Sequence, residues 1–450
     1  MYGPIVVIAP DQVHTTDDLA MKTIYDKTSI KTSFYSSMGS WKGVTSTLGF
    51  VDYPTASPSR NNLLQCFQNK NLSVLVQSIE SHIDEFLALL KDSAATDSVV
   101  DGVVVFRLLA LDIVTDVLWG ETDTLLSKKD LHSAEMSQAP VFLRRFHAFS
   151  TWNAMKSFIP GVDLFVRLMG SKQWRQLRND CNDMDITARD ALERWKKNNK
   201  KVSPEQQGNE TEGPKLHREK DVLSMLQSMN SAKAPAVPTE DIPAYMVEML
   251  AAGSSTTSHT AAFACWLLTR DTAAQRRLRG ELFDRFPDAS NIDITQAMEL
   301  PFLDGVIRET MRMYPMIPGP LERHLGKPIE VDGLVVRPGV VASTGAYNQG
   351  RLEHVYPRCD SWIPERWIQD NESMRLNWTP FGHGCRSCPG SNLAMTELKY
   401  MIAKIFRFYK VVVPPGCENE KLELADVFAA GSKTGHVWLK FVEASDAQNL

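Results

Sequence analysis

The sequence predicts a mainly helical fold with a small β-rich part. Apolar residues recur at helical spacing over residues 72–90 and 104–118, and again from about Asp241 to about Thr269. The last stretch, with Thr239 as a candidate cap, would form a helix about 45 Å long that crosses the whole molecule. Short apolar runs separated by Gly and Pro predict the strands, which are residues 329–331, 334–336 and 340–341.

The remaining segments extend this prediction. Residues 5–8 are apolar and are closed by Pro10, which predicts a buried strand near the N-terminus. A further helix follows Asp304 and ends before Pro315. Residues 196–221 are polar and predict a solvated loop, in which Asn209 begins a glycosylation sequon that we interpret as an unmodified surface site.

Composition limits the possible functions. The 450 residues carry a formal net charge of −5, and their 43% hydrophobic and 23% charged residues are ordinary for a globular enzyme. Nucleic acid is therefore not an expected partner. We expect one domain over residues 1–450. Seven widely spaced cysteines do not form a disulfide framework, and the short apolar N-terminal run is neither a signal peptide nor a membrane anchor.

The strongest signal is the decapeptide Phe381-Gly382-His383-Gly384-Cys385-Arg386-Ser387-Cys388-Pro389-Gly390, which precedes an amphipathic helix. A cysteine at a helix N-terminus meets the helix dipole and free N–H groups, and Arg386 adds positive charge, so we expect Cys388 to have a depressed pKa. Such a thiolate can ligate iron. Gly384 and Gly390 permit a tight turn and close approach to a flat macrocycle.

Other interpretations of this loop exist. A lone cysteine is more often a small buried hydrophobic residue than a ligand. Cys385, Cys388 and His383 would also suit a zinc knuckle or a redox dithiol, although the sequence offers no second ligand pair nearby. A c-type heme site needs a histidine where Pro389 stands. We interpret Cys385 as a bystander thiol.

Two further motifs precede the cysteine loop. Glu309 and Arg312 are three residues apart in the helix before Pro315, so they share a helix face, and Pro364-Glu365-Arg366-Trp367 follows. In the middle of the long helix, the run Ala252-Gly253-Ser254-Ser255-Thr256-Thr257 is made of small residues. Such a run usually serves close helix packing.

These motifs, in this order, resemble those of the cytochrome P450 family, and the resemblance covers nearly the whole chain. It implies the cytochrome P450 fold and a heme b whose iron is held by Cys388. It also implies a buried ion network of Glu309, Arg312 and Arg366, with Gly253 making room for O2 and Thr256 directing protons. Ser255 stands where the family carries an acid, so the resemblance does not settle how protons are delivered in this chain. Further heme contacts are implied for Phe381, Gly384, Arg386, Gly390, Arg323 and Arg60.

Within that set, Arg323 and Arg386 match the arginines that bind heme propionates, and Arg60 is what remains of a basic cluster in an early helix. One propionate contact is therefore expected to be missing. The resemblance places substrate contacts at residues 45–58, 146–166 and 429–431, and at Met249, Ala252, Met316 and Ile317.

The implied function is a monooxygenase that inserts one oxygen atom of O2 into a hydrophobic small molecule. The chain lacks a Gly-x-Gly-x-x-Gly fingerprint, so electrons are expected from NADPH through NADPH–cytochrome P450 reductase. The sequence most resembles fungal microsomal members that act in secondary metabolism. The resemblance implies that the full-length form lies on the cytosolic face of the endoplasmic reticulum membrane. We expect that the membrane anchor and the first helix of that form are absent here. The alternatives are a heme-thiolate isomerase or dehydratase that needs no reductase, and a non-catalytic heme-binding relic.

Overall fold

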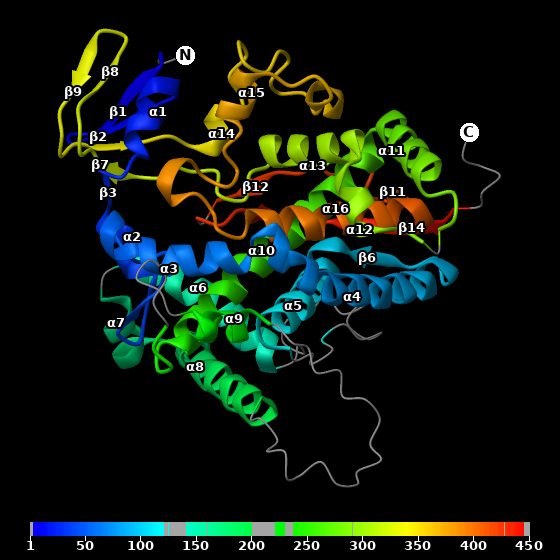
Figure 1. Cartoon of the computed structure of the whole chain (residues 1–450), viewed down its shortest axis with the longest axis horizontal. Helices are drawn as coiled ribbons and strands as arrows, with labels where there is room; N and C mark the ends of the chain where they lie inside the picture. Colours follow the sequence, from blue (N-terminus) through cyan, green and yellow to red (C-terminus); the bar gives the residue numbers. More distant parts are fainter. Residues whose placement is uncertain are drawn as a thin grey trace.

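A computed structural model confirms the predicted mainly helical fold (Figure 1). The structure describes residues 3–120, 125, 141–159, 161–199, 221–229, 237–289, 291–426 and 428–444. The helices are α1 (Asp18–Ile24), α2 (Ser33–Met38), α3 (Tyr53–Cys66), α4 (Asn69–Ala95), α5 (Gly102–Trp119), α6 (Val141–Phe158), α7 (Val162–Met169), α8 (Lys172–Asn198), α9 (Val222–Ser228), α10 (Ile242–Arg270), α11 (Thr272–Arg285), α12 (Ile294–Met298), α13 (Pro301–Met313), α14 (Ala346–Gln349), α15 (Glu372–Asn377) and α16 (Ser391–Phe408).

Residues 196–198, expected in a polar loop, instead complete the last turn of α8, and Asn209 lies outside the described residues. The strands are β1 (Ile5–Ala9), β2 (Gln12–Thr15), β3 (Ile30–Lys31), β4 (Ser40–Trp41), β5 (Val44–Thr45), β6 (Val99–Asp101), β7 (Arg323–His324), β8 (Ile329–Val331), β9 (Leu334–Val336), β10 (Val341–Ser343), β11 (Tyr409–Val412), β12 (Leu424–Ala425), β13 (Gly431–Ser432) and β14 (Trp438–Glu443).

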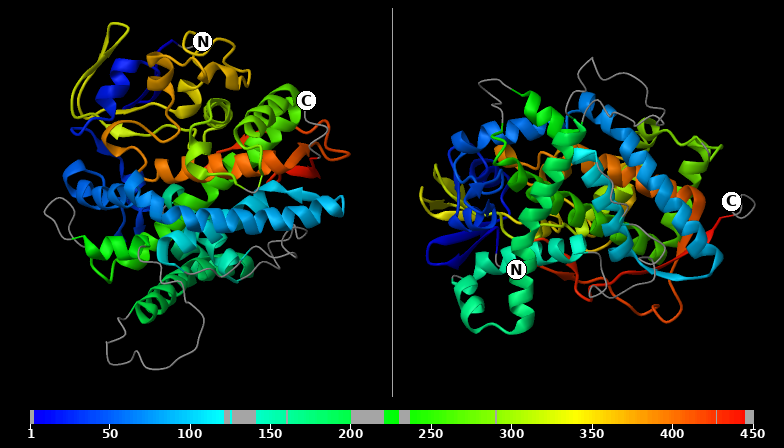
Figure 2. Two further views of the ribbon diagram at one scale, coloured as in Figure 1. Left: turned by 45° about the vertical axis from the view of Figure 1, so that its right-hand side comes forward. Right: turned by 90° about the horizontal axis from the view of Figure 1, so that it is seen from below.

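The long predicted helix is α10, which runs through the middle of the molecule (Figures 1 and 2). Its N-cap is Asp241 rather than Thr239, and Pro243 stands in the first turn, where the missing N–H is not needed. Most of its side chains are buried because α5 and α8 pack against it, as do α13 and α16. The central helix α10 thus packs against α16, the helix that follows the cysteine loop.

A five-stranded sheet forms the β-rich part, in the order β1-β2-β10-β7-β3. Its edge strand β1 is not the buried strand that was expected, because it pairs only with β2 and leaves Val7 71% exposed. At the other edge, β3 and β7 place Lys31 directly opposite Arg323. This pair brings two cations together at the end of the sheet.

The other large sheet has the order β11-β14-β6 and packs its β14 strand against α4. Among the described residues, no helix is both long and apolar enough to span a bilayer.

Candidate functional site

The cysteine loop is held in place by backbone hydrogen bonds before α16 begins. The Cys388 N–H donates to the Phe381 carbonyl at 2.8 Å, and the Ser387 N–H donates to the Gly384 carbonyl at 3.2 Å. Gly384 has a φ of 68°, and a Cβ there would collide with the Tyr25 carbonyl oxygen. Gly384 thus lets the loop approach α1 rather than a cofactor, whereas a Cβ on Gly390 would lie 4.0 Å from the Cys388 Sγ.

The Cys388 residue is exposed, although its thiol is surrounded by protein. Burial raises the pKa of this thiol, while a Gly390 backbone N–H and the Arg60 charge act in the opposite direction. The expected depressed pKa is therefore wrong for the thiol in its protein surroundings alone, because desolvation outweighs the helix terminus. A metal cation bonded to the sulfur reverses this balance.

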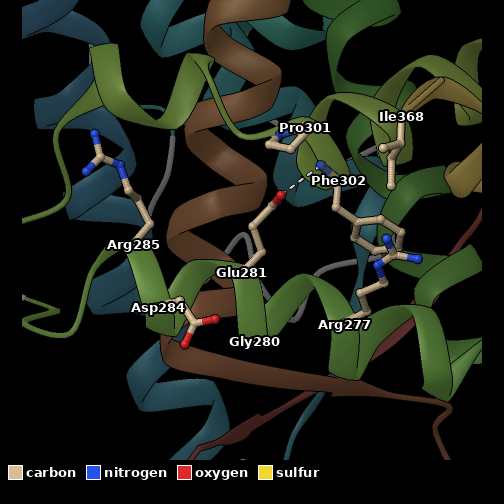
Figure 3. A pocket seen from close by; sticks show the side chains of 8 residues that line it. All are labelled: Arg277, Gly280, Glu281, Asp284, Arg285, Pro301, Phe302 and Ile368. Carbon is tan, nitrogen blue, oxygen red and sulfur yellow. Dashed lines mark hydrogen bonds between the residues drawn. The ribbon is translucent and has the colours of Figure 1, made fainter. Parts of the chain in front are cut away.

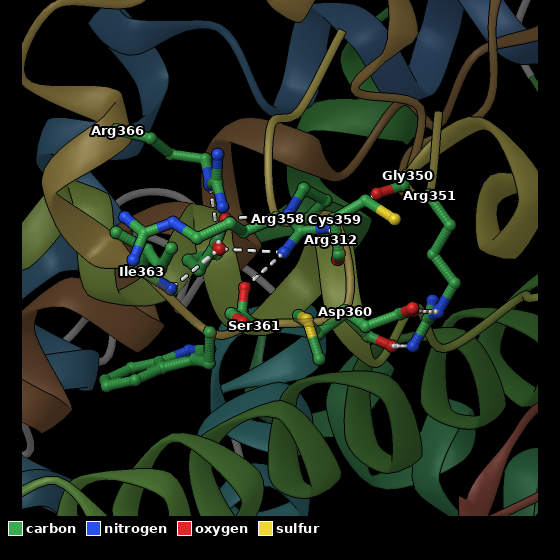
Figure 4. Close-up of polar contacts among 12 residues, drawn as sticks. Arg312, Gly350, Arg351, Arg358, Cys359, Asp360, Ser361, Ile363 and Arg366 are labelled. Carbon is green, nitrogen blue, oxygen red and sulfur yellow. Dashed lines mark hydrogen bonds and ion pairs between the residues drawn. The ribbon is translucent and has the colours of Figure 1, made fainter. Parts of the chain in front are cut away.

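The Glu309 carboxylate lies at the centre of a buried network. Its Oε1 accepts from Arg312 Nη2 at 2.8 Å and from Arg366 Nε at 2.9 Å, and its Oε2 accepts from Trp367 Nε1 at 2.9 Å. The Glu309 and Arg312 side chains are both 0% exposed. Arg312 also donates to the Ser361 carbonyl at 2.9 Å (Figure 4). The network thus ties α13 to the segment that leads toward the cysteine loop.

Four cations, Lys31, Arg60, Arg323 and Arg386, gather beside the cysteine loop, and we call them the cationic cluster. Arg60 donates to the Ser387 carbonyl at 2.9 Å, Arg386 donates to the carbonyls of residues 50 and 52, and Lys31 donates to the carbonyl of residue 48. Burial first, then Arg323 and Arg60, lower the pKa of Arg386 to about 10. Burial, Arg386 and Arg323 also hold the pKa of Lys31 well below its usual value. The four charges thus repel one another.

None of the four cations forms an ion pair with any carboxylate among the described residues. Glu248 lies near Lys31 and Asp52 near Arg386, so two carboxylates offset part of this positive charge. Partly buried cations that outnumber the nearby carboxylates are costly unless a further anion binds there. A ligand with two carboxylates and a metal that accepts a thiolate satisfies both the cationic cluster and Cys388. These residues therefore fit heme, and Lys31 was missed because its partners in the cluster are far away in the sequence.

The small-residue run of α10 has two different faces. Gly253 faces α5, where a Cβ would lie 2.8 Å from Val114 Cγ2, so the structure favours the helix-packing interpretation for this glycine. Ala252 is exposed in the middle of the helix, and Thr256 is half-buried and donates its hydroxyl to the Ala252 carbonyl at 2.7 Å. Ser255 is half-buried as well.

His259 is a site residue that sequence reasoning missed. It lies seven residues after Ala252 and three after Thr256, so helical periodicity puts the three on one face. Its Nδ1 lies 2.7 Å from the Ser255 carbonyl oxygen, and its Nε2 would lie 3.0 Å from a Cβ on Gly431. Burial and the nearby Arg107 lower the pKa of His259 to about 4, so the imidazole is neutral at physiological pH.

The cavity between α11 and the start of α13, of about 630 Å³, is not part of this site (Figure 3). None of the predicted site residues lines it, and Glu281 there accepts the N–H groups of residues 302 and 303 at the N-terminus of α13. Within the described part of the chain, no group of three or more His, Cys, Asp or Glu is placed to hold a metal, so the zinc interpretation of Cys385 and Cys388 gains no support.

Comparison with known proteins identifies the family to which this site belongs. The family model described as Cytochrome P450 matches residues 2–437. The chain is 26% identical to a benzoate 4-monooxygenase of Aspergillus niger over 91% of this chain and 80% of that protein, and 25% identical to a cytochrome P450 monooxygenase of Sordaria araneosa over 98% and 81%. A match to a dihydroniloticin synthase of Azadirachta indica is 30% identical over 46% of this chain and spans only 41% of that relative's length.

The crystal structure of another cytochrome P450 superposes with a TM-score of 0.75 at 16% identity, covering 96% of this chain and 89% of that one, which supports the fold. Sequence motifs, fold and family model thus agree over nearly the whole chain. The chain belongs to the cytochrome P450 family.

Proposed function

We propose that this chain is a heme-thiolate monooxygenase that inserts one oxygen atom of O2 into a small hydrophobic substrate. Membership of the family implies heme, O2 and an electron donor. The observation that carries the proposal is the placement of the exposed Cys388 beside four cations, none of which forms an ion pair with a carboxylate among the described residues. We assign Cys388 as the iron ligand and the cationic cluster as the propionate site. Lys31 would supply the contact that the reduced basic cluster around Arg60 lacks.

A heme held by a cysteine thiolate, when bound, activates O2 for attack on unreactive C–H bonds. Residues of the chain itself hold the cysteine ligand in position. The Glu309 network fixes the segment before the loop, and Phe381 holds the Cys388 N–H. We assign the proton-directing role to Thr256. Because Ser255 carries no carboxylate, the neighbouring neutral His259 is the titratable side chain best placed to assist it.

We propose NADPH–cytochrome P450 reductase as the electron source, and oxidation of a fungal secondary metabolite as the reaction. Matches to monooxygenases of two fungi, which cover 80% and 81% of those proteins, support this assignment. The test is reconstitution of the heme-loaded protein with a fungal reductase and extracts of the producing organism. Substrate consumption that depends on NADPH and O2 supports the proposal. Turnover without NADPH would instead favour the isomerase or dehydratase alternative.

Thr256→Ala is expected to raise the ratio of hydrogen peroxide to product by at least about tenfold, because protons no longer reach the reacting oxygen in step with electrons. Thr256→Ser keeps the hydroxyl and is expected to restore coupling. Ser254→Ala is the matched control, since the Ser254 hydroxyl also donates to a carbonyl four residues earlier, at 2.7 Å, and a residue two positions from Thr256 lies on nearly the opposite face of the helix. Peroxide and product are measured per NADPH consumed. Unchanged coupling in Thr256→Ala would move the role to another residue.

We further propose that the protein associates with the endoplasmic reticulum membrane through one edge. Four apolar side chains of α7 are exposed, namely Leu164, Phe165, Leu168 and Met169, with exposed fractions of 56–75%. Val7, Leu334 and Val335 are exposed as well, and the strands that contain them, β1 and β9, lie on the same side of the molecule as α7 (Figure 1). Exposed apolar area of this extent is typical of a membrane or protein contact.

The double variant Phe165→Glu/Leu168→Glu is expected to weaken binding to phosphatidylcholine vesicles by about tenfold or more, because two apolar side chains no longer enter the lipid. Val442→Glu is the control, as Val442 is 39% exposed and belongs to β14, which lies on the opposite side of the molecule from α7 (Figure 1). Co-sedimentation with vesicles measures both. Equal loss in the two variants would show that added charge alone, and not this edge, determines binding.

A further inference from the structure

A cavity of about 340 Å³ lies between α2, the segment that follows α13, and the β12–β13 hairpin. Its lining residues are Phe34, Tyr35, Ile317, Gly319, Pro320, Glu322, Asp426 and Phe428. Three of these are aromatic and two are acidic. Among the residues that the structure describes, no lysine, arginine or histidine lines it.

The aromatic side chains form one connected group. The ring centroids of Phe34 and Phe428 are 5.5 Å apart, those of Phe34 and Tyr35 are 5.5 Å apart, and those of Tyr35 and Phe428 are 6.4 Å apart. Phe428 has a φ of 82°, which a non-glycine residue rarely adopts, and its N–H donates to Asp426 Oδ1 at 2.9 Å. The hairpin is thus bent so that a ring and a carboxylate face the same cavity.

The two carboxylates keep unused acceptor capacity. Glu322 accepts from the Thr32 hydroxyl at 3.1 Å through Oε2. Asp426 Oδ2 approaches Gly319 so closely that a Cβ there would lie only 3.0 Å away. Neither carboxylate forms an ion pair within the described part of the chain. Arg323 and Lys31 lie over the Tyr35 ring, 5.2 and 4.9 Å from its centroid, and both belong to the cationic cluster that we assign to the heme propionates.

An aromatic group with carboxylates and no lining cation is the environment that stabilises an organic cation, because ring faces and carboxylates both attract positive charge. The cavity adjoins the expected substrate region, since Ile317 lines it and the Ala430 N–H of the hairpin donates to the Met316 carbonyl at 2.7 Å. We propose that this cavity binds the ammonium group of a substrate that carries a basic amine. This inference rests on the proposed monooxygenase function and names its substrate class.

The proposal is tested by binding alone, with the heme-loaded protein and calorimetric titration. Benzyltrimethylammonium is the probe, because its quaternary nitrogen has no lone pair for the iron. Neopentylbenzene is its neutral isostere, and 3-phenylpropanoate is an anionic counterpart. We expect the cation to bind at least about tenfold more tightly than the isostere, as expected for a partly desolvated charge among rings and carboxylates. We expect the anion to bind least.

Asp426→Asn is expected to weaken binding of the cation by about tenfold and to leave the neutral isostere unchanged. Glu322→Gln should act in the same direction. Glu423→Gln is the matched control, because this carboxylate is on the same arm of the hairpin, just before β12, but pairs with Lys433 at 2.7 Å and does not line the cavity. Each variant is first shown to retain the carbon monoxide band, which establishes an intact fold and heme site.

Equal affinity for the cation and its isostere, or full affinity in Asp426→Asn, would overturn the inference. Preferential binding of 3-phenylpropanoate would overturn it as well. These results are separable from the fate of the proposed function. If the protein turns over with NADPH but does not prefer the cation, only this inference is wrong. If it binds the cation but shows neither the carbon monoxide band nor turnover, only the monooxygenase assignment is wrong.

Discussion

Cys388→Ser is expected to abolish the red-shifted carbon monoxide band of the reduced protein, because serine provides no thiolate to the iron. Cys385→Ser is expected to keep the band. The two cysteines are three residues apart, and both are free thiols. The N–H of Cys388 closes the loop by donating to the Phe381 carbonyl. Cys388 is also the cysteine that lies beside Gly390, at the start of α16.

Absorbance of the reduced, carbon monoxide-treated protein measures this difference, and total heme is assayed separately. Cys385 is a suitable control because Arg60 acts on both thiols, and burial raises the pKa of both cysteines. A protein that keeps the band as Cys388→Ser and loses it as Cys385→Ser would show that the register of the loop is wrong. Loss in both variants would show that the loop cannot tolerate serine at either position.

The parts of the site that could be predicted from sequence are those whose residues are close together in the chain. Glu309 and Arg312 are one helical turn apart, and the cysteine loop is a run of ten residues, so each motif is visible without knowledge of the fold. The mainly helical fold followed from apolar periodicity for the same reason. His259 also lies at helical spacing from Ala252 and Thr256 in α10, but the sequence interpretation concentrated on the run of small residues before it, which includes Gly253.

The parts that could not be predicted depend on contacts between distant segments. Lys31 becomes a site residue only because β3 pairs with β7, which places it opposite Arg323. Gly253 faces Val114, and nothing in either local sequence indicates that α5 packs there. Similarly, Val7 and Ile8 read as a buried strand because composition does not reveal that β1 is an edge strand. Chain topology decides these cases, and one sequence does not specify it locally.

Arg312→Ala is expected to have the largest effect on folding. The substitution leaves the Glu309 carboxylate without its bidentate partner in a fully buried position, and it also removes the donors to the carbonyls of Gly350, Cys359 and Ser361. Breaking one side of a buried ion pair costs about 3–5 kcal/mol. Arg366 alone does not compensate, because it meets Glu309 through a single nitrogen and its Nη2 already lacks a partner among the described residues.

We therefore expect Arg312→Ala to lower the free energy of unfolding in denaturant by about that amount and to yield protein with little bound heme. Arg312→Lys keeps the charge but not the planar fork of donors. Its free energy of unfolding and its heme content should therefore lie between those of Arg312→Ala and the parent protein. Arg375→Ala is the control, because its ion pair with Asp370 is 63% exposed on the arginine side and should matter little. Holoprotein of parental stability from Arg312→Ala would show that Glu309 tolerates burial without this partner, and the network would then have no part in holding the segment before Cys388.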